Sequence, residues 1–480
     1  MYRFRLSAMM FLEFFIWGAW LPLIFGYLPS LGFDAVEQAW IINAFALASF
    51  TAMFFSTQFA DRNFAAERFL AVSQLIGGVA ILGLFWVKEG WTTTLLDWQI
   101  NLSFWAFFGL MLVHSLFYVP TISITNSIAF ANVKDPQREF GPIRLWGTIG
   151  WIAASWPFVF ILVDWQRVPP FQFDSTIDWL GAALGTGKTG AALRDATRYT
   201  FLASAIASFV LAAFSLALPH TPPRPVQAGA ERFAWLEAMK LLRVPFILVL
   251  FLVTFFDAAV HSCYFFWTGR YLESVGIPGN WVMPVMSIGQ IAEIGTMAFL
   301  GFCLRKLGWR TTMVIGILGH AVRFGVFAFW PEPAPAVIVN LLHGICYAFF
   351  FATVYIFVDE FFPKDARSSA QGLFNFLILG LGPFVGNFIW AMLGDVYKAG
   401  DVVDFQGLFL VPTGIALFAA VLLLAFFHPP ERASDARMPH QIEEALAGDA
   451  WDDSAQAKAP AIPGEPSSEG IQERGDRFRE

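Results

Sequence analysis

Long apolar runs recur along the chain, and each approaches or exceeds the roughly 20 residues that an α-helix needs to cross a bilayer. Only a few polar side chains interrupt these runs. The pattern predicts twelve spans, at residues 6–28, 38–60, 69–88, 102–131, 142–163, 199–218, 245–267, 280–303, 311–330, 335–358, 369–394 and 405–427. We therefore expect an all-α membrane protein with both termini on the same side of the membrane.

The composition agrees with lipid as the main surroundings of the folded chain. Charged residues make up 14% of the 480 residues, whereas a soluble domain carries about 25%. The formal net charge is −7, and most of it comes from the polar segment 429–480, whose composition predicts disorder. The remaining chain is close to neutral, so we expect no nucleic-acid-binding surface.

Basic residues in the connections predict the orientation, because Lys and Arg accumulate on the cytoplasmic side of membrane proteins. Fifteen of them fall at the ends and connections on the side of the N-terminus, and three fall in the short loops of the other side. Both termini are therefore expected in the cytoplasm.

The chain also divides into two similar parts. A proline-rich segment, 219–233, follows the sixth span, and each part has a basic connection after its second span, at 60–68 and 304–310. Two six-helix halves with matching connections are the plan of the major facilitator transporters. We expect an N-terminal six-helix bundle at 1–218, a cytoplasmic linker at 219–243, a C-terminal six-helix bundle at 244–428 and a disordered cytoplasmic tail at 429–480.

Polar side chains inside the spans are costly in lipid, so they indicate either a cavity or a partner on another helix. Several of them are three, four or seven residues apart, which places them on a shared helix face. A structural role in helix packing is the alternative for each group. The groups are Glu13, Trp17 and Trp20; Arg144, Thr148 and Trp151; Asp257, His261 and Tyr264; Gln290 and Glu293; and His343 and Tyr347.

The chemistry of these groups suits a polar ligand with a flat ring. Arg144 keeps its charge and offers a fork of donors to paired oxygens, and the indole rings offer surfaces for stacking. Glu293 lies in mid-span among apolar residues, where a carboxyl can take up a proton on one side and release it on the other. Glu13 and Asp257 are further candidates for proton coupling. Arg323, in the ninth span, is expected to pair with another helix.

Neither a catalytic nor a metal-binding motif occurs in the sequence. Segment 185–190, GTGKTG, lacks the first glycine that a phosphate-binding loop requires. The three cysteines fall in apolar runs, which is not the pattern of a disulfide framework. We therefore expect no enzyme activity, no metal and no cofactor, with a proton gradient as the driving force.

Several segments resemble the nucleoside:proton symporters of the major facilitator superfamily. They are FLEFFIWGAWL (11–21), GPIRLWGTIGW (141–151), MSIGQIAE (286–293), HGICYAFFFATVYIFVDE (343–360) and RSSAQGLFN (367–375). They occur in the family's order and spacing, and the resemblance covers about residues 8–428. It implies a proton-driven importer in the cell inner membrane, whose partners are a nucleoside, protons and the lipid bilayer.

The resemblance also implies a substrate site that takes residues from both halves. They are Arg144, Thr148 and Trp151 from the first half, and His261, Tyr264, Gln290, Glu293, His343 and Tyr347 from the second. Similar residue types suit a disaccharide, so a proton-coupled sugar or glycoside transporter is the nearest alternative. A membrane sensor with a transporter fold is a second alternative.

Overall fold

The computed structural model describes residues 2–55, 64–95, 98–171, 173–223, 239–362, 364–400 and 402–429. Within these ranges the chain is almost entirely helical, with two short β-hairpins. Most of the expected linker, part of the basic connection at 60–68 and nearly all of the expected tail lie outside the described residues.

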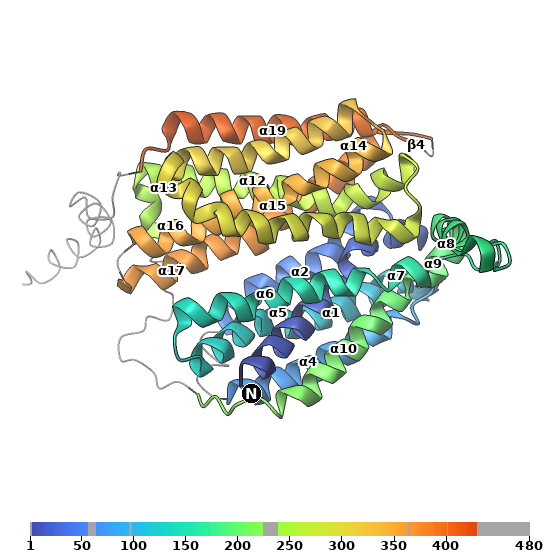
Figure 1. Cartoon of the computed structure of the whole chain (residues 1–480), viewed down its shortest axis with the longest axis horizontal. Coiled ribbons are helices and arrows are strands. Elements are labelled where there is room, and N and C mark those ends of the chain that lie inside the picture. The colour runs from blue at the N-terminus through green and yellow to red at the C-terminus, as the bar shows by residue number, and fades with distance from the viewer. Residues whose placement is uncertain are drawn as a thin grey trace, which may run out of the picture.

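The first half of the chain forms a bundle of long helices. They are α1 (Tyr2–Ser30), α2 (Ala35–Phe55), α4 (Ala66–Leu84), α5 (Leu102–Asn132), α6 (Pro136–Ser155) and α10 (Tyr199–Ser215). Helix α1 packs against α6 and α10, α4 packs against α5 and α10, and α2 packs against α5. These helices fill the lower part of the view in Figure 1.

The second half forms a bundle of its own, in the upper part of Figure 1. Its helices are α12 (Pro245–Ser274), α13 (Val282–Phe329), α14 (Pro333–Ile338), α15 (Leu342–Cys346), α16 (Thr353–Phe361), α17 (Lys364–Asn375), α18 (Gly382–Val396) and α19 (Phe405–Phe426). Two π-helical segments, η6 (Tyr347–Ala352) and η7 (Phe376–Leu381), join α15 to α16 and α17 to α18. Helix α13 packs against α15 and α19, and α12 packs against α18 and α19.

The helices account for twelve membrane crossings, as the hydrophobic pattern predicted. Within the described residues, nine helical stretches are long and apolar enough to span a bilayer. The stretch Gly279–Phe329, of 51 residues, provides two crossings because its backbone leaves the helical conformation at Gly308, where φ is 76°. Helices α2 and α6 supply the remaining two crossings. The expected all-α membrane fold is confirmed.

The expected fifth span, 142–163, and the expected loop after it differ from the structure, in which α6 ends at Ser155. Helix α6 begins at Pro136 instead of near residue 142, because the Asp135 side chain caps it by accepting a hydrogen bond from the Arg138 backbone N–H. The expected loop at 164–198 contains two further helices, α8 (Thr176–Gly185) and α9 (Gly190–Thr197). The apolar run alone shows neither the polar first turns of α6 nor these short helices.

One end of the molecule carries the hairpins, and we call it the hairpin end. Strands β1 (Thr92–Leu95) and β2 (Trp98–Asn101) pair between α4 and α5, and β3 (Lys398–Ala399) pairs with β4 (Val402–Val403) between α18 and α19. Helices α8 and α9 lie at the same end, on the right of Figure 1.

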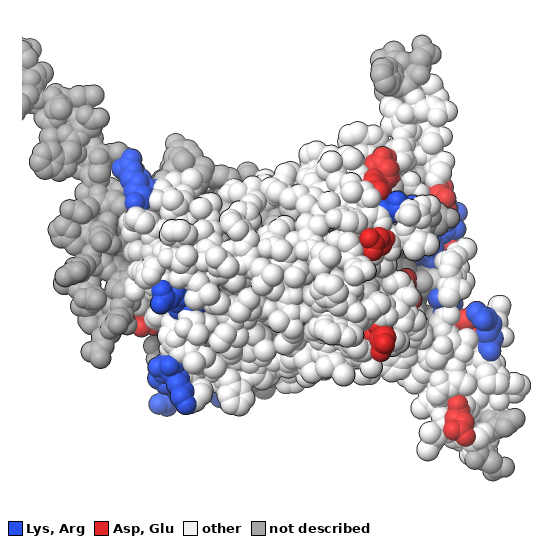
Figure 2. All heavy atoms as spheres, turned by 90° about the horizontal axis from the view of Figure 1, so that it is seen from above, with Lys and Arg blue, Asp and Glu red and all other residues white. Residues whose placement is uncertain are grey.

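Charged side chains avoid the middle of the molecule. On the face shown in Figure 2, Lys, Arg, Asp and Glu gather toward the two ends, and the belt between them carries none. Such a belt matches the hydrocarbon core of a bilayer, in which an exposed charge is costly. The chain is a multi-pass membrane protein.

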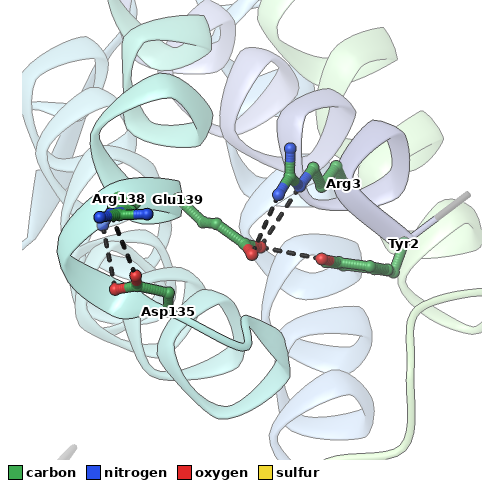
Figure 3. A network of polar contacts seen from close by, with 5 residues as sticks. All are labelled: Tyr2, Arg3, Asp135, Arg138 and Glu139. Atoms are coloured by element: carbon green, nitrogen blue, oxygen red, sulfur yellow. Dashed lines mark hydrogen bonds and ion pairs between the residues drawn. The ribbon is translucent and has the colours of Figure 1, made fainter.

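At the end opposite the hairpins, a polar contact ties the start of α1 to the start of α6. The Tyr2 hydroxyl donates a hydrogen bond of 2.9 Å to Glu139 Oε2, and Arg3 Nη2 lies 3.0 Å from Glu139 Oε1 (Figure 3). On the neighbouring turn, Arg138 pairs with Asp135 at 3.6 Å. These contacts fix the first turns of α6 against α1.

The contact to Glu139 predicts a pH-dependent stability. Hydrogen bonds from Arg3 and Tyr2 hold the pKa of Glu139 below its ordinary value. The stabilisation is therefore complete above the pKa of an unfolded glutamate, about 4.3, and it is lost as the pH falls through the lower folded value. We expect Glu139→Gln to lower the melting temperature in detergent by a few degrees at most at neutral pH, and by nothing in acid.

A matched control for this prediction is Glu332→Gln. Glu332 is exposed, and its side chain has neither a hydrogen bond nor an ion pair within the described residues. Its replacement should leave the melting temperature unchanged at every pH. An equal loss for Glu139→Gln in acid and at neutral pH would show that the contact is not electrostatic.

Candidate functional site

A cavity of about 250 Å³ lies between the two halves, a little below the roughly 300–1,000 Å³ of typical small-molecule pockets. Its walls come mainly from α1, α2 and α6 of the first half and from α12, α13, α15, η6, η7 and α18 of the second. Aromatic and apolar side chains make up most of the wall. A small number of polar side chains interrupts it.

The first half contributes one face of α6. Arg144, Thr148 and Trp151 follow one another along this face, and all three line the cavity. The Arg144 guanidinium lies 4.0 Å above the ring centre of Phe14. The Trp151 ring meets the Trp17 ring edge to face, with 5.2 Å between their centres. This wall therefore combines a stacked cation with flat aromatic surfaces.

Two glycines allow the close helix contacts that position these side chains. A Cβ atom on Gly150 of α6 would overlap the backbone carbonyl of Phe11 in α1, and one on Gly344 of α15 would overlap the backbone of Glu293 in α13. The first contact brings the α6 face against α1. The second places His343 and Glu293 in the same wall.

The second half contributes seven polar side chains to the cavity. They are His261 and Ser262 from α12, Gln290 and Glu293 from α13, His343 from α15, Tyr347 from η6 and Asn387 from α18. Gln290 Oε1 is buried without a hydrogen-bond partner within the described residues. The Glu293 carboxyl likewise has neither a hydrogen bond nor an ion pair there. Both side chains are thus available to a ligand.

Three predicted residues do not line the cavity. Tyr264 is fully buried behind its wall, where its hydroxyl donates to Asn340 Oδ1 at 2.9 Å. Glu13 is buried within the first bundle. Asp257 is buried in the second bundle, with its Oδ2 atom 3.7 Å from His320 Nε2.

The surroundings of Glu13 are those of a link between helices. Its carboxyl oxygens accept hydrogen bonds from Thr121 Oγ1 at 2.7 Å and from Gln74 Nε2 at 2.9 Å. These partners belong to α5 and α4, so the side chain joins three helices of the first half.

The sequence analysis did not single out His320, which lies close to the cavity, and it did not identify the partner of Arg323. Arg323 pairs with another helix, as expected, but its partner is the cavity residue His343, at 3.0 Å between Nη1 and Nδ1. His320, one turn before Arg323, was not singled out, although it is fully buried. Its position inside a predicted span was the only available signal.

Several polar contacts join the two halves level with the cavity or nearer the hairpin end. They join Arg270 to Phe25 and Gln38, Asn43 to Phe384 and Asn387, Asn280 to Val159 and Leu184, and Trp281 to Leu184. These contacts hold the two halves together between the cavity and the hairpin end.

Comparisons with known proteins agree with this arrangement. The family model described as nucleoside H+ symporter matches residues 1–177 and 165–432. YegT of Escherichia coli (strain K12) is 31% identical over 439 residues, covering 88% of this chain and 93% of YegT. Xanthosine permease from the same organism is 26% identical over 458 residues, covering 91% and 99% of the two chains.

A solved structure shows the same fold. The crystal structure of the nucleoside transporter NupG matches with a TM-score of 0.72 and 23% sequence identity. The match covers 89% of this chain and 99% of the NupG chain. The expected major facilitator fold is thereby confirmed.

Proposed function

Because this chain belongs to the nucleoside H+ symporter family, we propose that the cavity between its halves is the site at which it carries a nucleoside. The protein is a proton-coupled nucleoside importer and not an enzyme. One observation carries the proposed location of the site. Eight of the nine side chains expected to bind substrate, drawn from both halves, line a single cavity.

The chemistry of a nucleoside matches the walls of this cavity. An aromatic base can stack on Trp151 or Trp17, and the sugar hydroxyls need polar partners such as Thr148. Arg144 supplies donors, and Gln290 Oε1 supplies an acceptor that is otherwise unpaired. Because these groups belong to different halves, a bound nucleoside would bridge them.

We also propose that the chain works by alternating access. Residues 1–218 and 244–428 would move as two halves about the cavity, joined by the linker 219–243. The excess of basic residues in the connections away from the hairpins supports a cytoplasmic position for that end and for both termini, in the inner membrane. In this orientation the hydrogen bonds of Arg270, Asn280 and Trp281 with the first half lie between the cavity and the outside.

Glu293 is the proton-coupling residue in this mechanism. Its carboxyl lines the cavity in mid-helix and has no competing partner within the described residues. Protonated Glu293 accepts the nucleoside from outside, the loaded halves reopen toward the cytoplasm, and the proton leaves after the substrate. Glu13 and Asp257 lie away from the cavity wall, so neither touches the ligand in this scheme.

The test is uptake of radiolabelled uridine and adenosine by vesicles that contain the purified protein, with the outside more acidic than the inside. We expect accumulation that stops when a protonophore collapses the gradient. Unlabelled nucleosides should compete, and nucleobases and disaccharides should compete poorly. Stronger competition by a disaccharide would favour a sugar or glycoside transporter and overturn the proposed substrate.

A further inference from the structure

A buried polar cluster lies directly behind the cavity wall in the second half. It consists of Asp257 and Tyr264 of α12, His320 and Arg323 of α13, and His343 of α15. Four of these side chains are fully buried, and only His343, which is 3% exposed, lines the cavity. A full charge at such depth requires close polar partners.

Arg323 binds two histidine rings at the same kind of nitrogen. Its Nη1 atom lies 3.0 Å from His343 Nδ1, and its Nη2 atom lies 2.8 Å from His320 Nδ1. The Tyr264 ring packs beneath the guanidinium, 4.1 Å from its central carbon. The guanidinium is thus held from one face and at two of its nitrogens.

These contacts determine which ring nitrogens carry protons. A guanidinium has donors only, so the Nδ1 atoms of both His343 and His320 must accept. A neutral imidazole that accepts at Nδ1 carries its proton on Nε2. The Nε2 atom of His320 lies 3.7 Å from Asp257 Oδ2, beyond hydrogen-bond distance, so the contact to Arg323 alone assigns this tautomer.

We propose that Arg323 is a positioning residue that fixes His343 as its Nε2–H tautomer. Arg323 occupies the Nδ1 side of the ring, so Nε2–H is the group that His343 offers to a ligand in the cavity. The site would then select a substrate with a hydrogen-bond acceptor at that position, either a carbonyl oxygen or an unprotonated ring nitrogen. The choice of substrate rests on the proposed nucleoside function, whereas the tautomer does not.

His114 provides an internal comparison. Its Nδ1 atom lies 3.0 Å from the carbonyl oxygen of Gly77, which can only accept. His114 must therefore carry its proton on Nδ1, the opposite tautomer from His343. Both side chains are buried in the same protein, so burial alone does not explain the difference.

The tautomers can be measured by nitrogen-15 NMR of the full-length protein in lipid vesicles, with labelled histidine. The single variants His343→Gln, His320→Gln and His114→Gln each remove one ring and assign its signals. We expect protonated Nε2 for His343 and His320, and protonated Nδ1 for His114. Arg323→Gln should release His343 into a mixture of tautomers.

A protonated Nδ1 on His343 in the wild-type protein would overturn the proposal. An unchanged His343 signal in folded Arg323→Gln would overturn the role of Arg323. If Arg323→Gln fails to fold, the wild-type spectrum still decides the tautomer, and Arg323→Lys tests the role. A lysine cannot reach both rings with a planar fork, so His320 or His343 should lose its single tautomer.

Ligand binding tests the consequence for selectivity. The probes are nucleosides that lose a base acceptor. The 3-deaza and 7-deaza analogues of adenosine each lose one ring nitrogen acceptor and nothing else. The uridine analogue without the 4-oxygen and purine riboside, compared with inosine, lose a carbonyl oxygen, and the neighbouring ring N–H becomes an acceptor. Loss of the acceptor that faces His343 should weaken wild-type binding by about tenfold or more, because a buried donor is left unpaired. In His343→Leu, removing this acceptor from the ligand should hardly weaken binding. In Arg323→Gln, removing it should weaken binding less than in the wild type.

The outcomes separate this inference from the proposed function. If the penalty for a missing acceptor persists in His343→Leu, or if no acceptor matters in the wild type, the selectivity proposal is wrong. If no nucleoside binds the wild-type protein, the proposed nucleoside function is wrong. The NMR spectrum still tests the tautomer of His343, because that measurement does not depend on nucleoside binding.

Discussion

Replacing Glu293 with glutamine is expected to abolish accumulation of nucleoside driven by a pH gradient. Glu293 is the only carboxyl side chain among the described residues that line the cavity. Glutamine keeps its size and its hydrogen bonding but cannot exchange a proton. Binding and exchange of nucleoside across the membrane should therefore persist in part, while uphill transport should fall to the level of empty vesicles.

Two measurements on the same vesicles check this result. Exchange of labelled for unlabelled nucleoside, with no pH gradient, shows whether the loaded protein still exposes its site to both sides of the membrane. Accumulation under a pH gradient shows whether transport is still coupled to protons. Glu13→Gln is the matched comparison, because Glu13 is also a carboxyl within a span but is hydrogen-bonded to Thr121 and Gln74 away from the cavity. It should keep coupling and lose some stability. Full accumulation by Glu293→Gln would refute the assignment of the proton site.

The second large effect is expected for Arg144→Lys, which should weaken nucleoside binding by about tenfold or more, equivalent to about 1.4 kcal/mol or more. Lysine keeps the positive charge but loses the planar fork of donors and its stacking against Phe14. Expression and the elution profile in detergent should remain normal, because the Arg144 side chain faces the cavity and forms no ion pair within the described residues.

Binding of labelled nucleoside to the purified protein is the direct measurement for Arg144→Lys. Arg138→Lys, two turns earlier on the same helix, is the control. Arg138 is exposed, and its weak ion pair with Asp135, at 3.6 Å, lies outside the cavity. It should bind like the wild type. Normal binding and uptake by Arg144→Lys would show that Arg144 anchors α6 at the membrane surface instead.

Much of the fold could be predicted because hydrophobic length is a local property of the sequence. Each crossing was visible as an apolar run, and the division into halves was visible from repeated basic connections. The start of α6 was misplaced because its first turns are polar and depend on the cap at Asp135. Helices α8 and α9 were missed because they are short and lie outside the apolar runs.

The candidate site was predictable only as far as helical spacing allows. Spacing placed Asp257, His261 and Tyr264 on one face of α12, yet only His261 lines the cavity. One face of a helix is broad, so side chains that share it can pack against different helices at different positions along its length. Tyr264 meets Asn340, and Asp257 meets His320, both on helices distant in the sequence. Such pairings depend on how the bundle closes, which spacing within one helix does not reveal.

The hydrogen bonds between the halves near the hairpin end also bear on affinities measured from the two faces of a membrane. They favour the conformation in which they form, at about 1 kcal/mol of net stabilisation for a typical bond. A ligand that must first capture the opposite conformation binds with its intrinsic affinity reduced by the fraction of molecules in that conformation. If the hairpin end faces outward, nucleoside presented from outside must first break these hydrogen bonds and shift the resting equilibrium, whereas nucleoside presented from the cytoplasm need not break them. Right-side-out and inside-out vesicles would then give unequal half-saturation values for one and the same cavity.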